Sequence, residues 1–390
     1  MKKKTLFSIS LILCGFFLQA SLIDVYKKGT IYFVPSNDFG VDQYGDCFFS
    51  DPDRYMTVAP DGSIFVSNTR ECNIFKYNKY GKLIKEFMQR GDGPGDGLYP
   101  FKLCILDGKY LSVEEYAFNR KISIFDFSGK FIKVLKTKHA VFDHCAIGNN
   151  KIAYITIKET QSPDKNEMRV IIKDVNSGTE KLLLSVKLYN PRSKPLDDGT
   201  SIYTNIVKGL GSNVYLEKTK TGNLLVGVSN SPDIKIFSPD GTLIKSFRLT
   251  MEPVEVSGEY INHFKETVIK KMEEENSIKP SGDDRKLNAY KKYDFRNLFE
   301  KYFPYYNCIQ VDAEGNILVF KNTGCREKCL PTFQVYSPEG KFICESKLDF
   351  KTAIGLVDLS QIKFTSQGII GLFQSKDSVD ISIQLMKMEL

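Results

Sequence analysis

Short runs of alternating apolar and polar residues, separated by glycine turns, recur along this chain. The segment from Met56 to Phe87 has the pattern of four short strands in a row, and variants of it begin at Asn213 and at Cys308. Period-two alternation is typical of strands with one buried face. A module that cannot bury its own faces must stack against copies of itself, so the repeat predicts an all-β fold.

The glycine turns give the number of modules. Each repeat carries one turn after its innermost strand and one before its outermost strand. Six turns of the first kind are present but only five of the second, and the last repeat reaches Leu390 after three strands. A spare strand, Thr30 to Val34, lies near the N-terminus. Closing a ring removes exposed sheet edges. The sequence therefore predicts a six-bladed β-propeller whose N-terminal strand is the outer strand of blade six; an irregular β-sandwich is the alternative.

The long insertions all fall in loops that share one face of such a propeller. They link the second and third strands of a blade, or one blade to the next: Lys158 to Glu167, Asn190 to Ser212, Thr250 to Tyr306 and Asn322 to Pro331. The opposite face keeps minimal turns. One elaborated face predicts a scaffold that binds with that face.

The insertion 250–306, between blades four and five, is predicted to be helical. Ser257 can cap a helix whose apolar residues follow a 3.6-residue period: Tyr260, Ile261, Phe264, Val268 and Met272. A second apolar set precedes Pro304: Tyr290, Tyr293, Leu298, Phe299 and Tyr302. Both helices are expected to pack on the propeller rim as core; the alternative is a lid or a platform for a partner.

The N-terminus has the composition of an export signal. Three lysines, an apolar run from Thr5 to Leu18 and a small residue at Ala20 predict a signal peptide over residues 1–20, cleaved before Ser21. An uncleaved anchor is one alternative, and lipidation of Cys14 is another, disfavoured by the bulky Leu13. The protein is thus expected in the periplasm or at the cell surface, with no membrane span after cleavage.

The net charge and the cysteine content limit the classes of partner and of metal site that are expected. The net charge of +7 includes the three N-terminal lysines, and no basic block interleaved with aromatics is present, which argues against nucleic acid. Cys325 and Cys329 flank three residues in a loop and are predicted to form a disulfide. Because the histidines are not at ligand spacing with this pair, a zinc site is not expected.

One loop carries a family resemblance. The segment PDGSIFVSN, followed by the glycine-rich loop from Arg90 to Pro100, resembles exported bacterial six-bladed propellers related to NHL-repeat proteins. In that group a GxGPGE-Phe loop joins blades one and two, and here Asp96 stands for the usual Glu and Leu98 lies near the usual Phe. The resemblance covers the chain from about Lys28 onward. It implies the fold far more than an activity.

The main functional hypothesis is a non-catalytic binding protein of the cell envelope that holds a protein, peptide or glycan and needs no cofactor. Neither a GxSxG motif nor a phosphate-binding loop is present. The candidate contacts come from face-forming loops or from the channel mouth: Asn68, Arg70, Glu115, Tyr116, Arg120, His144 and Arg326.

The alternative hypothesis is a hydrolase of the lactonase type. Six-bladed propellers include lactonases that hold a divalent cation at the channel mouth through Glu, Asn and Asp. Glu115, Asp143 and Asn230 are oxygen ligands suited to a hard cation such as calcium. They do not form a recognisable spacing signature. His144, beside Asp143, is expected to be structural rather than a catalytic base.

Overall fold

A computed structural model describes residues 21–36, 38–40, 48–49, 54–115, 120–158, 167–187, 193–195, 201–203, 213–278, 284–324, 330–350, 354–356, 359, 362–365, 368–375 and 381–389. The predicted signal peptide, Cys14, Tyr116, Arg326 and the Cys325–Cys329 pair lie outside these residues. None of the helices in the described part of the chain combines the length and apolar character that crossing a membrane requires.

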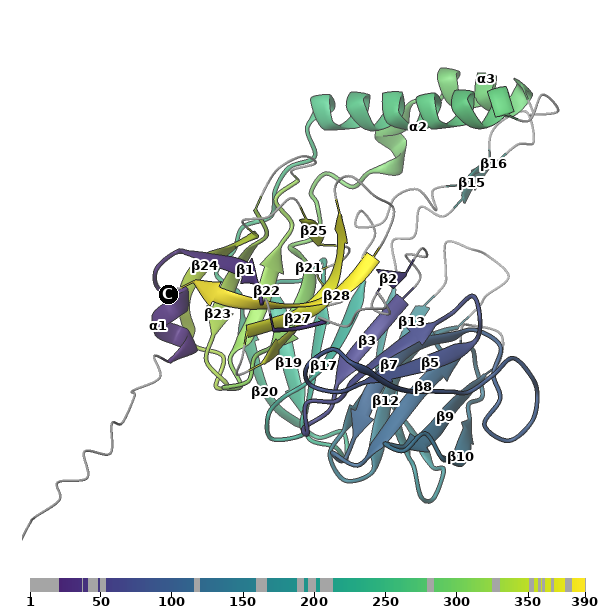
Figure 1. Ribbon diagram of the computed structural model, residues 1–390. Helices are drawn as coiled ribbons and strands as arrows, with labels where there is room; N and C mark the ends of the chain where they lie inside the picture. The colour runs from purple at the N-terminus through teal and green to yellow at the C-terminus, as the bar shows by residue number, and fades with distance from the viewer. Residues whose placement is uncertain are drawn as a thin grey trace, which may run out of the picture.

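Six groups of mostly antiparallel strands, the blades, are arranged around a common centre (Figure 1); blades one to four are separate four-stranded sheets, and blades five and six belong to one ten-stranded sheet. Blades one to three are β3 (Arg54–Val58) to β6 (Leu83–Phe87), β7 (Pro100–Leu106) to β10 (Phe131–Lys136), and β11 (Asp143–Ile147) to β14 (Glu180–Lys187). Their middle strands are β4 (Ile64–Asn68), β5 (Asn73–Tyr77), β8 (Tyr110–Glu115), β9 (Lys121–Asp126), β12 (Lys151–Lys158) and β13 (Glu167–Asp174).

The remaining blades follow the same order. Blade four is β17 (Val214–Lys218), β18 (Leu224–Val228), β19 (Asp233–Phe237) and β20 (Leu243–Arg248), and blade five is β21 (Tyr306–Val311), β22 (Ile317–Lys321), β23 (Thr332–Tyr336) and β24 (Phe342–Phe350). Blade six has β26 (Ile362–Thr365), β27 (Gly368–Ser375) and β28 (Ile381–Glu389). Short strands are added outside this pattern: β2 (Phe48–Phe49), β15 (Ser193–Pro195), β16 (Ser201–Tyr203) and β25 (Ile354–Leu356).

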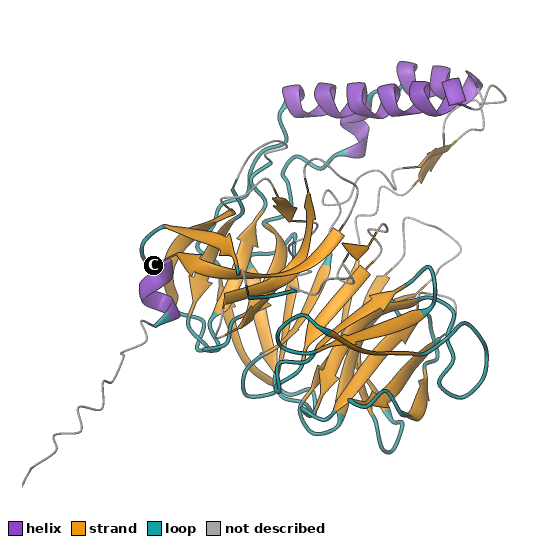
Figure 2. Ribbon diagram, in the orientation of Figure 1, coloured by secondary structure: helices purple, strands orange, loops and turns teal. Residues whose placement is uncertain are grey.

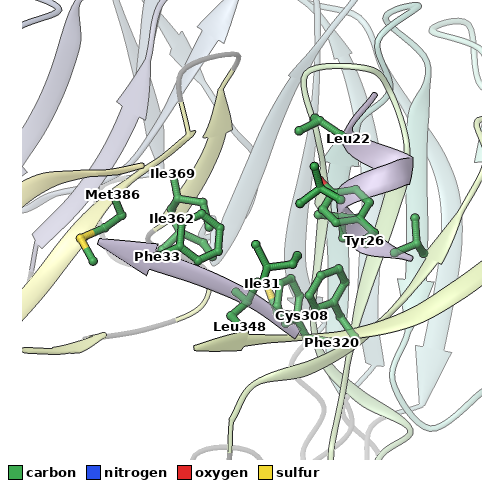
Figure 3. Close-up of a cluster of buried hydrophobic side chains, with 14 of the residues drawn as sticks. Leu22, Tyr26, Ile31, Phe33, Cys308, Phe320, Leu348, Ile362, Ile369 and Met386 are labelled. Atoms are coloured by element: carbon green, nitrogen blue, oxygen red, sulfur yellow. The ribbon is translucent and has the colours of Figure 1, made fainter. Parts of the chain in front are cut away.

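The N-terminal strand closes the ring, as predicted. Strand β1 (Thr30–Pro35) pairs antiparallel with β28, with Tyr32 opposite Glu389, and is the fourth strand of blade six. It also pairs in parallel with the end of β24, so blades five and six share one continuous sheet. Figure 3 shows Ile31 and Phe33 of β1 among side chains of both blades. This burial secures the closure, because apolar area removed from water stabilises it.

A short helix that the sequence analysis did not predict, α1 (Leu22–Tyr26), precedes this strand. The Tyr26 hydroxyl donates to Asp312 Oδ2 at 3.0 Å, and the Leu22 amide donates to Glu314 Oε1 at 2.9 Å. Both acceptors lie in the turn between β21 and β22, so α1 fastens the N-terminus to blade five.

The turns have the predicted backbone geometry, with one difference in blade three. Glycines such as Gly62 and Gly340 take positive φ, 84° and 76°, where a side chain would be strained. In the first turn of blade three, Asn149 and Asn150 have φ of 60° and 54° instead of the preceding Gly148. Asn tolerates this conformation better than most residues, since its short polar side chain can bond locally.

The insertion between blades four and five is helical, as predicted. Helix α2 (Gly258–Ile278) is capped by Ser257, whose hydroxyl accepts from the Tyr260 amide at 3.1 Å. Helix α3 (Asp284–Lys292) and a 3-10 turn, η2 (Phe295–Leu298), complete the insertion. Figures 1 and 2 show α2 and α3 beyond one end of the blades, on the side of β15 and β16. We call this end the insertion face and the other end the plain face.

The apolar residues of the insertion pack against one another. Their buried cluster contains Ile261, Phe264 and Val268 of α2 together with Tyr290, Phe295, Leu298 and Phe299, and it includes no residue of a blade. The expectation that the helices pack on the rim therefore differs from the observed packing. Tyr302, predicted to be core, is 41% exposed, and the neighbouring Phe303 is buried in its place.

Candidate functional site

The innermost strands of all six blades surround a central cavity of about 390 Å³. These strands are β3, β7, β11, β17, β21 and β26. Each follows a link on the insertion face, so its first residues lie at that end and its last residues lie at the plain face. The cavity is thus the channel of the propeller.

Each inner strand contributes a residue that lines the channel. The strand register shows which residue of the blade's second strand lies opposite it. The pairs include Cys104 with Ser112, Cys145 with Ala153, and Glu217 with Leu225. We call the six lining residues the channel ring: Thr57, Cys104, Cys145, Glu217, Gln310 and Lys363. Most of the second-strand partners are apolar, whereas the ring residues are polar or sulfur-containing. The channel ring therefore carries polar groups at positions where the propeller fold does not require them.

Charged and aromatic side chains add to the channel lining. Lys102 and Asp143 form an ion pair between blades two and three. Lys363 Nζ donates to Gln310 Oε1 at 3.4 Å, and Lys218 Nζ donates to the Ile105 carbonyl at 3.2 Å. The rings of Tyr55 and Phe101 contact each other, with centroids 3.9 Å apart. Burial lowers the pKa of Lys102, but Asp143, Cys104 and Glu217 together raise it more, so this lysine stays charged.

A buried polar network joins blade two to blade three beside the channel. His144 Nε2 lies 2.9 Å from Ser112 Oγ, and His144 Nδ1 lies 3.3 Å from Glu114 Oε2. All three side chains are fully buried. Ser112 and Glu114 are two positions apart on β8, so both point at blade three. The network holds the two sheets together through one imidazole.

The hydrogen bonds indicate where the protons lie. Ser112 Oγ donates to the Cys104 carbonyl at 3.2 Å, which leaves it to accept from His144 Nε2. His144 Nδ1 faces a carboxylate. Burial lowers the pKa of His144, but Cys104 and Glu114 raise it to about 10. Burial raises the pKa of Glu114 above its ordinary value. The carboxylate and the imidazole therefore share a proton that a buried His144 without these partners would release.

The predicted contacts do not form one surface. Asn68 is buried and bonds Glu71, with Nδ2 to Oε2 at 2.8 Å. Glu115 is buried under the glycine-rich loop, accepts from the Leu98 amide at 3.0 Å and pairs with Lys121 at 3.0 Å. His144 belongs to the buried network. Arg70 and Arg120 are exposed. The first three thus have internal partners, and two arginines remain as surface contacts.

The three residues of the hydrolase hypothesis have different surroundings. Glu115 holds the glycine-rich loop, Asp143 pairs with Lys102, and Asn230 is exposed in the turn after β18. In the described part of the chain, no group of three His, Cys, Asp or Glu side chains is placed to hold a metal ion. The arrangement gives this hypothesis no support, and it stays a prediction.

Sequence reasoning missed most of the channel lining. Lys102, Glu217, Gln310 and Lys363 are polar residues inside otherwise apolar inner strands, and Ser112 and Glu114 interrupt an apolar second strand. A polar residue at an inner-strand position was the available signal. Its use needed the strand register, which decides whether the side chain faces the channel or a neighbouring blade.

Comparisons with known proteins agree on the fold. Residues 46–201 match the DUF5128 family model, described as a 6-bladed beta-propeller. No curated protein matches the chain. A member of the DUF4221 family from Bacteroides vulgatus is similar in structure, with 12% identity, coverage of 93% of this chain and 99% of that one, and a TM-score of 0.53.

Other solved structures resemble the chain less closely. A protein of unknown function from Bacteroides thetaiotaomicron has 10% identity, coverage of 85% and 70%, and a TM-score of 0.43. Virginiamycin B lyase from Staphylococcus aureus, with quinupristin, has 12% identity, coverage of 87% and 85%, and a TM-score of 0.42. Nothing is concluded about this chain from these two similarities. Together with the closed ring of sheets, the comparisons identify this protein as a six-bladed β-propeller.

Proposed function

We propose that this protein is an exported, non-catalytic binding protein of the cell envelope, and that it holds a charged segment of a protein, peptide or glycan in its central channel. The N-terminal composition supports export. The channel is preferred to the outer loops because charged side chains line it, with Lys102 and Asp143 toward the insertion face and Glu217 and Lys218 toward the plain face.

One observation carries the proposal: the charges inside the channel. Lys102, Asp143, Glu217, Lys218 and Lys363 line a space bounded by low-dielectric sheets. Removing charged groups from water is unfavourable unless partners compensate. Apolar residues would close the same propeller without that cost, as they do between other blades. Retained charges of both signs therefore favour a ligand that carries charges of both signs.

The size of the channel limits the kind of ligand. A volume of about 390 Å³ lies within the usual range of small-molecule sites, which is roughly 300–1,000 Å³. A folded partner cannot enter such a space, but one or two residues of a peptide, or one sugar, can. The insertions around the mouth are available to hold the rest.

The test uses residues 21–390 as bait in a native cell-envelope extract. The channel variant carries Glu217→Ala and Lys363→Ala, and the matched control carries Lys245→Ala on the exposed outer strand β20. We expect the wild type and the control to capture the same partner, and the channel variant to lose it at an unchanged melting temperature. Equal capture by both variants contradicts a channel site.

A second variant separates the channel from the loop surface. Arg70→Ala with Arg120→Ala removes the two exposed arginines among the predicted contacts. If this variant alone loses the partner, binding takes place on the loops and the channel proposal is wrong.

A further inference from the structure

Two cysteines line the channel from neighbouring inner strands and differ in their surroundings. Cys104 of β7 pairs with Ser112, and Cys145 of β11 pairs with Ala153. Both residues belong to the channel ring. Cys145 is buried in an apolar cluster with Ile155 and Val214, whereas Cys104 is partly exposed. They form a natural pair for comparing one thiol with another.

Polar groups lie beside Cys104, which also packs against the apolar cluster between blades two and three. Its Sγ donates to the His144 carbonyl at 3.2 Å, and the His144 ring is fixed by Ser112 and Glu114. Lys102 lies two positions earlier, within a register shift of β7, and lines the same cavity. The charged and titratable groups near the thiol are Lys102, Glu114, Asp143, His144 and Cys145.

The net pKa shifts of the two thiols have opposite directions. Burial raises the pKa of Cys104, but His144 and then Lys102 lower it more, and the net pKa lies below that of an ordinary cysteine. Burial and the neighbouring Cys104 raise the pKa of Cys145 well above that value. A thiolate is the nucleophile in cysteine chemistry, and neighbouring cations favour it.

A second observation also indicates that the network is incomplete. Glu114 is fully buried, and its Oε1 has no hydrogen-bond partner among the described residues. An unpaired buried carboxylate oxygen is unfavourable in a site that serves only to join two blades. Its retention beside the imidazole fits a group that positions His144 for another task.

We propose that Cys104 is a nucleophilic thiol of the channel, positioned by His144 and Glu114, which exchanges with small carboxylate-bearing disulfides and holds them as mixed disulfides. This inference does not depend on the proposed binding function. It assigns a covalent modification site to the channel ring.

The exchange balances without any further reactant. The Cys104 thiolate attacks one sulfur of the disulfide, a new S–S bond forms, and the old S–S bond breaks. The departing thiolate takes a proton from water. The disulfide is the oxidant, Cys104 is oxidised to the mixed disulfide, and the released half is reduced to a thiol.

The charges and the volume of the channel indicate which class of disulfide can bind there. Lys102, Lys218 and Lys363 line the same cavity, which favours a carboxylate over a cationic group on the incoming molecule. The volume of about 390 Å³ excludes a folded protein and admits a small molecule. A small disulfide with carboxylates meets both conditions.

The first test measures which cysteines react. The full chain is treated with 5,5′-dithiobis(2-nitrobenzoate), a carboxylate-bearing disulfide, and the modified cysteines are identified by peptide mass spectrometry. At pH 7 we expect Cys104 to react about tenfold faster than Cys344, which is also partly exposed but lies on the outer strand β24. We expect the midpoint of its pH profile to lie below that of Cys344. A Cys104 that reacts no faster than Cys344 overturns the proposal.

Variants test the positioning role and the charge preference. Cys104→Ser should abolish the fast phase, and Cys145→Ser should leave it unchanged. His144→Gln should slow the fast phase and move its pH midpoint upward, which a merely structural role would not do. If His144→Gln fails to fold, Lys102→Met removes the other cation and should give a smaller change in the same direction. The ratio of the rate with the carboxylate-bearing probe to the rate with the cationic disulfide cystamine should be larger at Cys104 than at Cys344, a comparison that cancels the faster departure of the aromatic thiolate; equal ratios contradict the assigned class.

Discussion

The junction between blades two and three is polar, whereas the junction between blades four and five is apolar at the corresponding positions. Glu114 faces His144 in the first. In the second, Gly227 and Ile309 occupy the places of Glu114 and His144. They lie against each other, since a Cβ atom added to Gly227 would be 2.5 Å from Ile309 Cδ1. Ser112 is likewise matched by Leu225, each being the ladder partner of a channel-ring residue. Neighbouring blades of this propeller can therefore pack together through either polar or apolar residues at these positions.

This difference distinguishes the residues that the propeller fold requires at a blade junction from polar residues that it does not require. Leu225, Ile309 and Val319 seal blades four and five by burying apolar area. Blades two and three also bury an apolar cluster, but beside it they carry a buried His144–Glu114 pair and its network, which are seldom more stabilising than apolar packing of equal volume. The polar junction also adjoins Cys104 and the Lys102–Asp143 pair. We infer that its polarity serves the channel rather than the stability of the propeller.

The largest expected effect comes from breaking the polar junction on one side. His144→Ala leaves Glu114 buried without its partner, and we expect a loss of about 3–5 kcal/mol in the free energy of unfolding. Urea unfolding followed by circular dichroism measures it. A loss below about 1 kcal/mol would mean that water or another group already satisfies Glu114, and that the network contributes little.

A smaller effect is expected from overpacking the apolar junction. In Gly227→Ala, the added methyl group would lie 2.5 Å from Ile309 Cδ1 and 2.6 Å from the Tyr306 hydroxyl. Both neighbours are buried, so we expect a loss of about 1–3 kcal/mol in the same urea experiment. Gly258→Ala, at the start of α2 with open space around it, serves as the control. An unchanged stability in Gly227→Ala would show that blades four and five can move apart.

The free energy of unfolding should also depend on pH in a way that differs between the wild type and a variant without His144. The effect is smaller, and the pKa shifts determine its sign. A raised folded-state pKa contributes stability below the unfolded pKa, and that contribution is lost as the pH rises to the folded value. For His144 the loss extends from about 6.5 to about 10. The lowered pKa of Cys104 acts in the opposite direction up to about pH 8.5, the ordinary thiol value.

Above about pH 8.5 the gain from Cys104 is complete, whereas the loss from His144 continues to about pH 10 and is joined by a loss from Cys145, whose pKa is raised. Between about pH 8.5 and 10 we expect the wild type to lose up to about 1.4 kcal/mol per pH unit more than a variant that lacks His144. Urea unfolding of both proteins at several pH values measures the difference. Parallel curves would show that His144 is neutral in the folded protein.

The sequence predicted the architecture because its signals are local and repeated. Turn glycines and period-two strands recur in each blade, and Ser257 caps α2 as expected. Closure by β1 followed from counting the turns. The packing of the insertion was less predictable, since an apolar stripe does not say which surface covers it. Its residues contact each other, and Tyr302 is exposed.

The site was harder to predict, because it depends on contacts between residues far apart in the sequence. His144 was a candidate contact, yet its partners Ser112 and Glu114 lie on another blade. Glu115 was chosen in place of Glu114, and these neighbours on β8 face opposite sides of the sheet. A one-residue difference in register thus decides which carboxylate meets the imidazole.

The most direct test of the central claim transfers the apolar junction onto the polar one. The variant carries Ser112→Leu, Glu114→Gly and His144→Ile, and it keeps Cys104. Both its free energy of unfolding and the rate at which Cys104 reacts with 5,5′-dithiobis(2-nitrobenzoate) are measured. We predict stability within about 1 kcal/mol of the wild type, since apolar residues can replace a buried ion pair without loss, and a Cys104 rate reduced about tenfold to that of an ordinary thiol. A well-folded variant with an undiminished Cys104 rate, or a variant that loses several kcal/mol, would contradict the claim that the polarity of this junction serves the channel.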